Sequence, residues 1–125
     1  GNLPTETIRQ VETLSSGLPQ LDIPDMSPVL LHGDAQQNNF ISTPQGAMVI
    51  DPAVYYGSPE MDLAYVDYFQ PVPEEVFLGY QEILPIAPEF SQRRDLWRVS
   101  AYLAAVTVEG AGHLSLLKGA VQKYL

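Results

Sequence analysis

The sequence contains no cysteine. Without cysteine, the chain can form no disulfide, no thiolate-bound zinc site and no thiol nucleophile. This excludes a small secreted scaffold held together by disulfides. Any catalysis must therefore rely on other side chains.

Long hydrophobic runs are also missing. No apolar stretch approaches the roughly 20 residues that a transmembrane helix needs. The first residues do not show the basic region followed by an apolar region that marks a signal peptide. We therefore predict a cytoplasmic protein that has no membrane partner.

Basic residues are scarce: the chain has 6 Lys and Arg against 15 Asp and Glu, with a formal net charge of -9. Nucleic acids and anionic membranes repel such a chain, so neither is expected as a partner. Between Arg9 and Arg93 there is no lysine or arginine at all, yet this stretch holds Asp34, Asp51 and Asp62. These carboxylates either form a solvated acidic surface or gather around a cation.

The chain does have enough apolar residues to fold. Hydrophobic residues make up 46% of its 125 residues and charged residues 17%, despite 11 prolines. This composition is typical of a globular protein, and the length predicts one domain.

Apolar spacing, together with the positions of proline and glycine, predicts a mainly helical chain with one β-hairpin. Helices are expected at residues 5–16, 59–69, 74–84 and 91–108, with a last helix around 117–124. A short strand is expected at 28–32, and hairpin strands at 39–42 and 47–51.

The hairpin turn, Thr43-Pro44-Gln45-Gly46, sets the register of the two strands. Counting outwards from a pairing of Ser42 with Ala47 or Met48 places Asn39 opposite Ile50 or Asp51. Opposed residues in an antiparallel pair have Cβ atoms about 4.5 to 5.5 Å apart. Asn39 and Asp51 could therefore share a ligand.

Three polar residues around this hairpin suggest phosphoryl transfer: Asp34, Asn39 and Asp51. The Asn39 amide oxygen and the Asp51 carboxylate are hard oxygen ligands of the kind that Mg²⁺ prefers, and Asp34 could orient an attacking hydroxyl. Taken singly, each residue is more often a turn or helix cap. Their convergence across a hairpin favours the catalytic interpretation.

These residues also carry a family resemblance. The string His32-Gly33-Asp34 with Asn39, then Val49–Pro52 and Asp62–Ala64, resembles the signature of the aminoglycoside phosphotransferase and protein-kinase-like superfamily. The string Asp51–Gly57 with Glu60, and then the spacing of Phe77, Tyr80, Leu84-Pro85 and Arg94 before Leu96-Trp97, is similar to the fructosamine kinase (ketosamine 3-kinase) family. The resemblance runs from about Pro28 to Trp97.

The resemblance implies a fold and a reaction. The fold is α+β and mainly helical: the carboxy-terminal lobe of a protein-kinase-like fold, spanning residues 1–125, with helices around a small catalytic hairpin. Asp34 is implied as the catalytic base, with Asn39 and Asp51 as ligands of Mg²⁺ on the phosphates of ATP. The acceptor is implied to be a sugar hydroxyl of a ketoamine.

His32 and Asp62 are implied to support the catalytic loop. In kinase-like folds the residue in the place of His32 packs beneath that loop, and the residue in the place of Asp62 hydrogen-bonds the loop backbone. Neither would touch substrate. For Asp62, the alternative is a carboxylate favoured by the helix dipole near a helix start.

Two segments depart from the family pattern. Residues 35–38, Ala-Gln-Gln-Asn, replace a bulky aromatic, a small hydroxyl residue and a glycine, and Ala104-Ala105 stands where the family tends to have Asn-His. Both changes point to a different or lost acceptor.

The sequence also has no lysine before Lys118, so it lacks the lysine that a kinase places on the nucleotide phosphates. We therefore expect the chain to be a carboxy-terminal lobe that has no amino-terminal lobe and is inactive by itself. Apolar residues around Phe40, Met48 and Tyr55 would then be uncovered, which predicts a homodimer.

Two other functions stay open at this point. One is a metal-dependent hydrolase that uses His32, Asp34, Asp51 and perhaps His113, since histidine and aspartate also bind transition metals. The other is a non-catalytic interaction module derived from a kinase lobe.

Overall fold

The computed structural model describes residues 3–125, which form two compact units. One unit combines the chain up to Ile23 with Asp95–Leu125, and the other is the continuous segment Pro24–Arg94. The helix α4 (Phe90–Glu109) contributes residues to both. Each unit has buried apolar side chains of its own.

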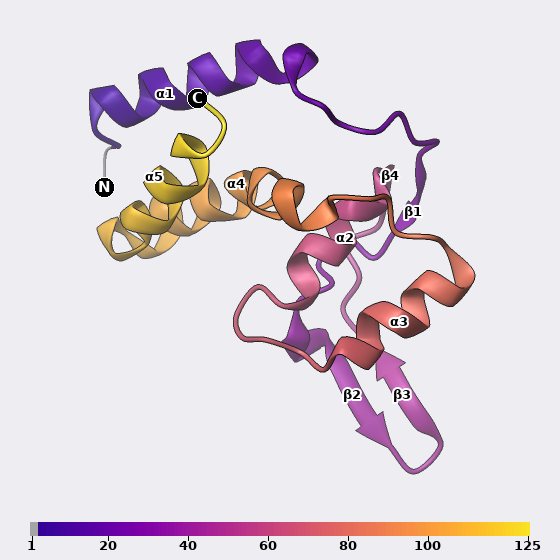
Figure 1. The fold of residues 1–125 in the computed structure, drawn as a ribbon. Coiled ribbons are helices and arrows are strands. Elements are labelled where there is room, and N and C mark those ends of the chain that lie inside the picture. The colour runs from indigo at the N-terminus through magenta and orange to yellow at the C-terminus, as the bar shows by residue number, and fades with distance from the viewer. Residues whose placement is uncertain (1–2) are drawn as a thin grey trace. The chain divides into compact units, whose positions relative to one another are not determined.

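Among the residues that the structure describes, the first unit contains helices and no strand. It contains α1 (Thr5–Gly17), the 3₁₀ turns η1 (Leu18–Gln20) and η3 (Ala111–His113), residues 95–109 of α4, and α5 (Leu114–Gln122). Helix α1 packs against α5, as Figure 1 shows. Leu14 from α1 and Leu117 and Val121 from α5 are buried in its core.

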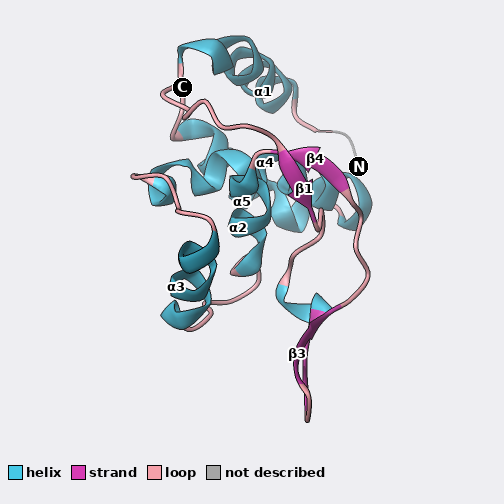
Figure 2. Cartoon of the chain, turned by 90° about the vertical axis from the view of Figure 1, so that its right-hand side faces the viewer, coloured by secondary structure: helices cyan, strands magenta, loops and turns pink. Residues whose placement is uncertain are grey.

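The four strands that the structure describes all belong to the second unit. Strand β1 (Val29–Leu31) pairs antiparallel with β4 (Tyr55–Gly57), and β2 (Phe40–Thr43) pairs antiparallel with β3 (Gly46–Val49). The unit also contains η2 (Gln37–Asn39), α2 (Pro59–Val66) and α3 (Glu74–Ile83). Figure 2 shows β1 and β4 side by side.

The fold class predicted from the sequence, α+β and mainly helical, is confirmed. Each predicted helix is present, although α2 ends at Val66 and not at residue 69. Strand β4 was not predicted, because three residues are too few to show an alternating pattern. Among the described residues, no helix is long and apolar enough to cross a membrane.

The β2–β3 hairpin has the predicted register, with Ser42 opposite Ala47 and Phe40 opposite Val49. We expected helices around this hairpin. Instead, almost every residue of both strands is exposed, and the two strands project beyond the helices of their unit (Figure 1). Apolar side chains such as Ile41 and Met48 therefore face solvent.

A buried ion pair connects α2 to the start of α4 within the second unit. The Arg93 guanidinium donates from Nη2 to Glu60 Oε1 at 2.7 Å and from Nε to Glu60 Oε2 at 3.0 Å. Both side chains are buried, with 8% and 2% of their surface exposed. Arg93 also donates to the Pro88 carbonyl at 2.9 Å. The charges are therefore compensated by several hydrogen bonds, as buried charges must be.

Arg94, the next residue, joins α3 to the same region. Its Nη1 lies 3.0 Å from Asp67 Oδ2, and its guanidinium lies over the rings of Phe77 and Phe90, 5.5 and 5.2 Å from their centres. Stacking on aromatic faces is characteristic of arginine. These contacts tie α3 and the loop after α2 to the start of α4.

Candidate functional site

The candidate site is built on the loop that follows β1, residues His32 to Asp34, within the second unit. Asp62, on α2, accepts hydrogen bonds from the His32 backbone N–H at 2.8 Å and from the Gly33 N–H at 3.0 Å. One carboxylate thus holds two consecutive backbone groups of the loop. This is the contact that the resemblance implied for Asp62.

Gly33 allows the loop to pass close to the segment after Ile50. Its φ is +85°, in the left-handed region that glycine adopts without steric cost. A Cβ atom at this position would lie 2.0 Å from the Ala53 carbonyl oxygen. The Ala53 N–H donates to the His32 carbonyl at 2.7 Å, so the two segments are hydrogen-bonded at the point of closest approach.

The His32 ring connects both sides of this junction. Its Nδ1 accepts from the Asp34 backbone N–H at 3.2 Å, and its Nε2 lies 2.8 Å from the Ile50 carbonyl oxygen. The tautomer with its proton on Nε2 satisfies both contacts. His32 therefore fixes the backbone of Asp34 and the backbone next to Asp51.

Asn39 is buried and bound to Asp34. Its Nδ2 donates to the Asp34 backbone carbonyl at 2.7 Å and lies 3.1 Å from Asp34 Oδ2. Both partners are acceptors, so the atom that faces them must be the amide nitrogen. The amide oxygen of Asn39 and one carboxylate oxygen of Asp34 accept no hydrogen bond from the described residues.

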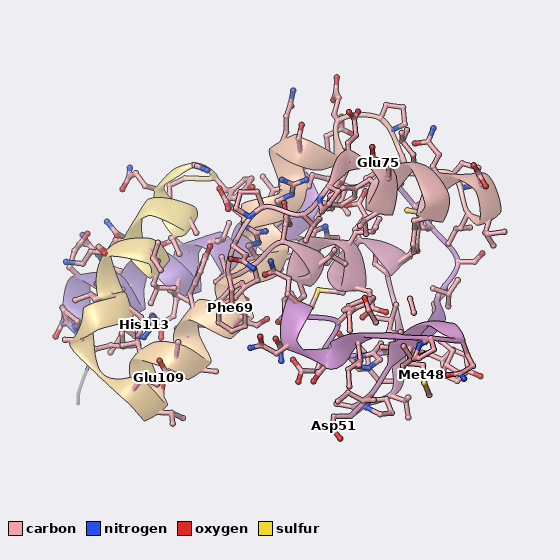
Figure 3. All side chains as sticks on the ribbon, turned by 90° about the horizontal axis from the view of Figure 1, so that it is seen from below. Met48, Asp51, Phe69, Glu75, Glu109 and His113 are labelled. Carbon is pink, nitrogen blue, oxygen red and sulfur yellow. The ribbon has the colours of Figure 1, made fainter. Side chains whose placement is uncertain are left out.

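Of the two partners predicted for Asn39, Ile50 and Asp51, the structure selects Ile50, and Asp51 lies one residue beyond it. The Ile50 N–H donates to the Asn39 carbonyl at 2.9 Å, so Asn39 stands opposite Ile50. Asp51 has a φ of +51° and is exposed, and its side chain projects from the outer edge of the ribbon in Figure 3. Its carboxylate has no hydrogen-bond partner within residues 3–125.

The donor chemistry around Asn39 and Asp51 fits a magnesium ion. An amide oxygen and a carboxylate, neither of them used by the protein, are the hard ligands that Mg²⁺ takes, and it commonly keeps several waters as well. The described residues contain no group of three or more His, Cys, Asp and Glu that could hold a metal ion. His113, which the hydrolase hypothesis included, belongs to the other unit and pairs with Glu109 at 2.6 Å.

Tyr55, on β4, packs against the glycine of the loop, since a Cβ on Gly33 would lie 3.2 Å from its ring. Burial, and then the neighbouring Tyr65 and Asp62, raise the pKa of the Tyr55 phenol above its usual value.

Sequence reasoning missed the role of Gln37. Its Nε2 donates to the Gln70 carbonyl at 2.7 Å, and its Oε1 accepts from the N–H groups of Phe69 and Gln70 at 3.0 and 3.1 Å. A loop glutamine follows no pattern that would predict such contacts. The only signal was the departure of residues 35–38 from the family pattern.

The other departure, Ala104-Ala105, lies on α4 in the first unit. Ala104 is exposed and Ala105 is half-buried. Their proposed effect on the acceptor stays a prediction.

In comparisons with known proteins, the matching family model and two of the matching curated relatives carry the names of sugar-amine kinases. The family model described as fructosamine kinase matches residues 6–125. A probable ketoamine kinase from Klebsiella aerogenes is 32% identical over 96% of this chain and 39% of its own length. A chloroplastic protein-ribulosamine 3-kinase from Oryza sativa subsp. indica is 36% identical over 80% of this chain and 29% of its own length.

A solved structure has the same fold. A protein from Thermobifida fusca, assigned as a fructosamine-3-kinase, is 30% identical and superposes with a TM-score of 0.89 over 98% of this chain and 43% of its own chain. The chain thus spans about a third to two-fifths of the length of the first curated relatives it matches, 34% and 39% in two of them.

Proposed function

This chain belongs to the fructosamine kinase family, and from that membership we propose that it is the carboxy-terminal, catalytic-loop lobe of an ATP-dependent small-molecule kinase. The reaction would transfer the γ-phosphoryl group of ATP to a sugar hydroxyl of a ketoamine. The names of its relatives, which include ketoamine and ribulosamine kinases, support this acceptor class. Such a kinase would work where ATP is available, and we place it in the cytoplasm.

The arrangement of Asn39 is the observation that carries the proposal. Its amide nitrogen is used to hold the Asp34 backbone at 2.7 Å, so its amide oxygen is turned away from Asp34. That oxygen and the exposed carboxylate of Asp51 would hold Mg²⁺. When bound, the ion would neutralise charge on the phosphate oxygens.

Asp34 is proposed as the catalytic base. One of its carboxylate oxygens is steadied by Asn39 at 3.1 Å, and the other is available to an acceptor hydroxyl. The hydroxyl oxygen would form a bond to the γ-phosphorus as the bond to ADP breaks. Its proton would pass to the Asp34 carboxylate, which orients the hydroxyl for attack.

His32, Gly33 and Asp62 are proposed as positioning residues. Asp62 holds two backbone N–H groups of the loop, and the His32 ring bonds the Asp34 N–H and the Ile50 carbonyl. Precise positioning matters here, because phosphoryl transfer depends on alignment and on electrostatic stabilisation.

The nucleotide is not bound by these residues alone. No lysine precedes Lys118. This chain would therefore not neutralise the negative charge that remains on the phosphates after Mg²⁺ has bound. We therefore propose that the isolated 125-residue chain has no kinase activity. We also propose that its exposed hairpin, with Phe40, Ile41 and Met48, supports a homodimer.

The metal site can be tested with Mn²⁺ as a paramagnetic substitute for Mg²⁺. We expect NMR signals of Asn39 and Asp51 to broaden at lower Mn²⁺ concentrations than signals of other acidic segments, and Asp51→Asn to weaken this effect. Asp25→Asn, at another exposed acid, is the control. The assignment would be contradicted if the signals of Asp25 and Asp51 broadened equally, or if no signal near Asn39 broadened.

The catalytic assignment can be tested in a protein that joins this chain to a nucleotide-binding lobe. Asp34→Asn should lower phosphorylation of a fructose–amine adduct by about 10² to 10⁴-fold, the usual contribution of a general base. The isolated chain should not turn over ATP. If it did, and if Asp34→Ala abolished that turnover, the proposal that a second lobe is needed to bind the nucleotide would be wrong.

A further inference from the structure

The segment 32–39, which carries the candidate base Asp34, is attached at both of its ends to the same part of the second unit. At its start, the Asp62 carboxylate on α2 accepts from two consecutive backbone N–H groups of the segment. Near its end, the Gln37 side chain bonds backbone groups that lie just beyond α2. The first attachment was implied by the family resemblance, and the second was not.

Three hydrogen bonds make the attachment at Gln37. Its Oε1 accepts from the N–H groups of Phe69 and Gln70 at 3.0 and 3.1 Å, and its Nε2 donates to the Gln70 carbonyl at 2.7 Å. Turning the amide over would set donor against donor and acceptor against acceptor. The Gln37 side chain is therefore fixed in one orientation.

The backbone that Gln37 bonds has little freedom of its own. Asp67, the residue directly after α2, has its Oδ2 3.0 Å from Arg94 Nη1. On the other side, Pro71 follows Gln70 directly, and its ring fixes its own φ and restricts the residue before it. Gln37 thus ties the segment 32–39 to a part of the chain that is itself held in place.

Gln37 is also the first residue of the 3₁₀ turn η2, whose last residue is Asn39. The turn is closed by a bond from the Phe40 N–H to the Gln37 carbonyl, and the Asn39 N–H donates to the Gln36 carbonyl at 3.0 Å. The Gln36 side chain caps the turn by accepting from the Asn38 N–H at 2.8 Å. The backbone of Asn39 is therefore connected to the Gln37 attachment through one short, hydrogen-bonded turn.

We propose that Gln37 is a positioning residue for the metal site. Through η2 it holds Asn39 so that the amide nitrogen meets the Asp34 carbonyl, at 2.7 Å, and the amide oxygen stays available to Mg²⁺. Gln37 does not itself bind the ion, because its own amide oxygen is occupied by two N–H groups. This inference rests on the proposed function and assigns a further residue to the same site.

The proposal gives the departure of residues 35–38 from the family pattern a role in positioning a metal ligand. Partners that orient metal ligands typically contribute about 10 to 100-fold to metal affinity. Gln37→Met keeps the length of the side chain and removes all three hydrogen bonds. We expect this variant of the 125-residue chain to need at least about tenfold more Mn²⁺ to half-broaden the NMR signals of Asn39.

A second measurement needs no metal. In metal-free Gln37→Met, the side-chain amide protons of Asn39 should exchange with solvent faster, because their bond to the Asp34 carbonyl is formed for less of the time. The control is the same substitution at Gln45, an exposed residue in the turn of the β2–β3 hairpin. Gln45→Met should change neither the Mn²⁺ concentration nor the amide exchange.

A loss of stability alone would not give the expected result. Apparent affinity falls in proportion to the folded fraction, so a tenfold loss from unfolding would leave only about a tenth of the chain folded. The NMR spectrum of the variant reports that fraction directly.

Each outcome decides the proposal. An unchanged Mn²⁺ concentration in Gln37→Met, whatever the amide exchange shows, would overturn this inference and leave the proposed function intact. Equal weakening by Gln37→Met and Gln45→Met would also overturn it. If Mn²⁺ does not broaden Asn39 in the unsubstituted chain, the proposed metal site is wrong and this inference fails with it.

Discussion

At the scale of single residues, Gly33 has less space for an added Cβ atom than the other glycines that the structure describes. Its φ of +85° is strained for any other residue, and an added methyl group would meet the Ala53 carbonyl oxygen at 2.0 Å. That oxygen belongs to backbone that is itself hydrogen-bonded to His32, so it cannot move without breaking the junction. The loop geometry around Asp34 therefore depends on a hydrogen atom at this position.

We predict that Gly33→Ala lowers the free energy of unfolding by about 1 to 3 kcal/mol, the cost of a strained backbone conformation together with a steric clash. It should also abolish Mn²⁺ broadening at Asn39 and Asp51. Urea unfolding and the NMR experiment measure the two effects.

Gly79→Ala is the matched control for this substitution. Gly79 lies within α3, and a Cβ there would meet nothing within 4 Å. Alanine should stabilise the helix by about 0.5 to 1 kcal/mol. If both variants changed stability in the same direction, the steric explanation for Gly33 would be wrong.

At the scale of elements, the buried pair of Glu60 and Arg93 joins α2 to α4. We predict that Arg93→Met destabilises the protein by about 3 to 5 kcal/mol, because it removes the guanidinium charge that lies against the buried Glu60 carboxylate. The double variant Glu60→Met with Arg93→Met should recover most of this loss, since apolar side chains of similar size can replace a buried pair. Denaturant unfolding of both variants provides the measurement.

The exposed pair of Arg9 and Glu6 offers a comparison within the same chain. Its closest atoms are 2.6 Å apart, but 72% and 59% of the two side chains is exposed. Solvent screening should limit the effect of Arg9→Met to less than about 1 kcal/mol. Similar losses for Arg9→Met and Arg93→Met would show that burial is not the cause.

Several features of the site could be predicted from the sequence. Counting outwards from the turn at Pro44 placed Asn39 opposite Ile50 or Asp51, and the structure pairs it with Ile50, because a short turn fixes hairpin register to within about one residue. The start of α2 followed from Ser58, whose hydroxyl accepts from the Glu60 N–H at 3.3 Å. Local rules of this kind act over a few residues and are visible in the sequence.

Other features could not be predicted, because they depend on contacts between distant residues. The pairing of β1 with β4 involves only three residues on each side. Gln37 is hydrogen-bonded to Phe69 and Gln70, which follow it in the chain by 32 and 33 positions. Neither these bonds nor the closeness of Gly33 to Ala53 follows a local pattern. Asp62 was connected to the loop only through the family resemblance.

At the scale of the whole molecule, an apolar hairpin is combined with a net charge of -9. We predict that the chain self-associates through Phe40, Ile41 and Met48, and that added salt strengthens this association. Salt screens the repulsion between two acidic chains but leaves apolar burial intact. Sedimentation at several protein and salt concentrations measures the effect.

Met48→Gln should weaken the association, and Ile83→Gln should not. Ile83 is more exposed than Met48, at 89% against 54%, but it belongs to α3 and not to the hairpin strands. A monomer under every condition would defeat the prediction. So would equal weakening by the two substitutions.

The positions of the site residues along the chain have a further consequence, for folding. The candidate site residues all lie within the segment from His32 to Asp62. Among their hydrogen bonds, the one with the largest sequence separation joins residues 30 positions apart. The first unit, by contrast, must bring α1 together with α5, from opposite ends of the chain. Short loops close with less entropy loss and at higher rates than long ones. During synthesis from the amino terminus, the loop around Asp34 can therefore assemble before α5 has been made.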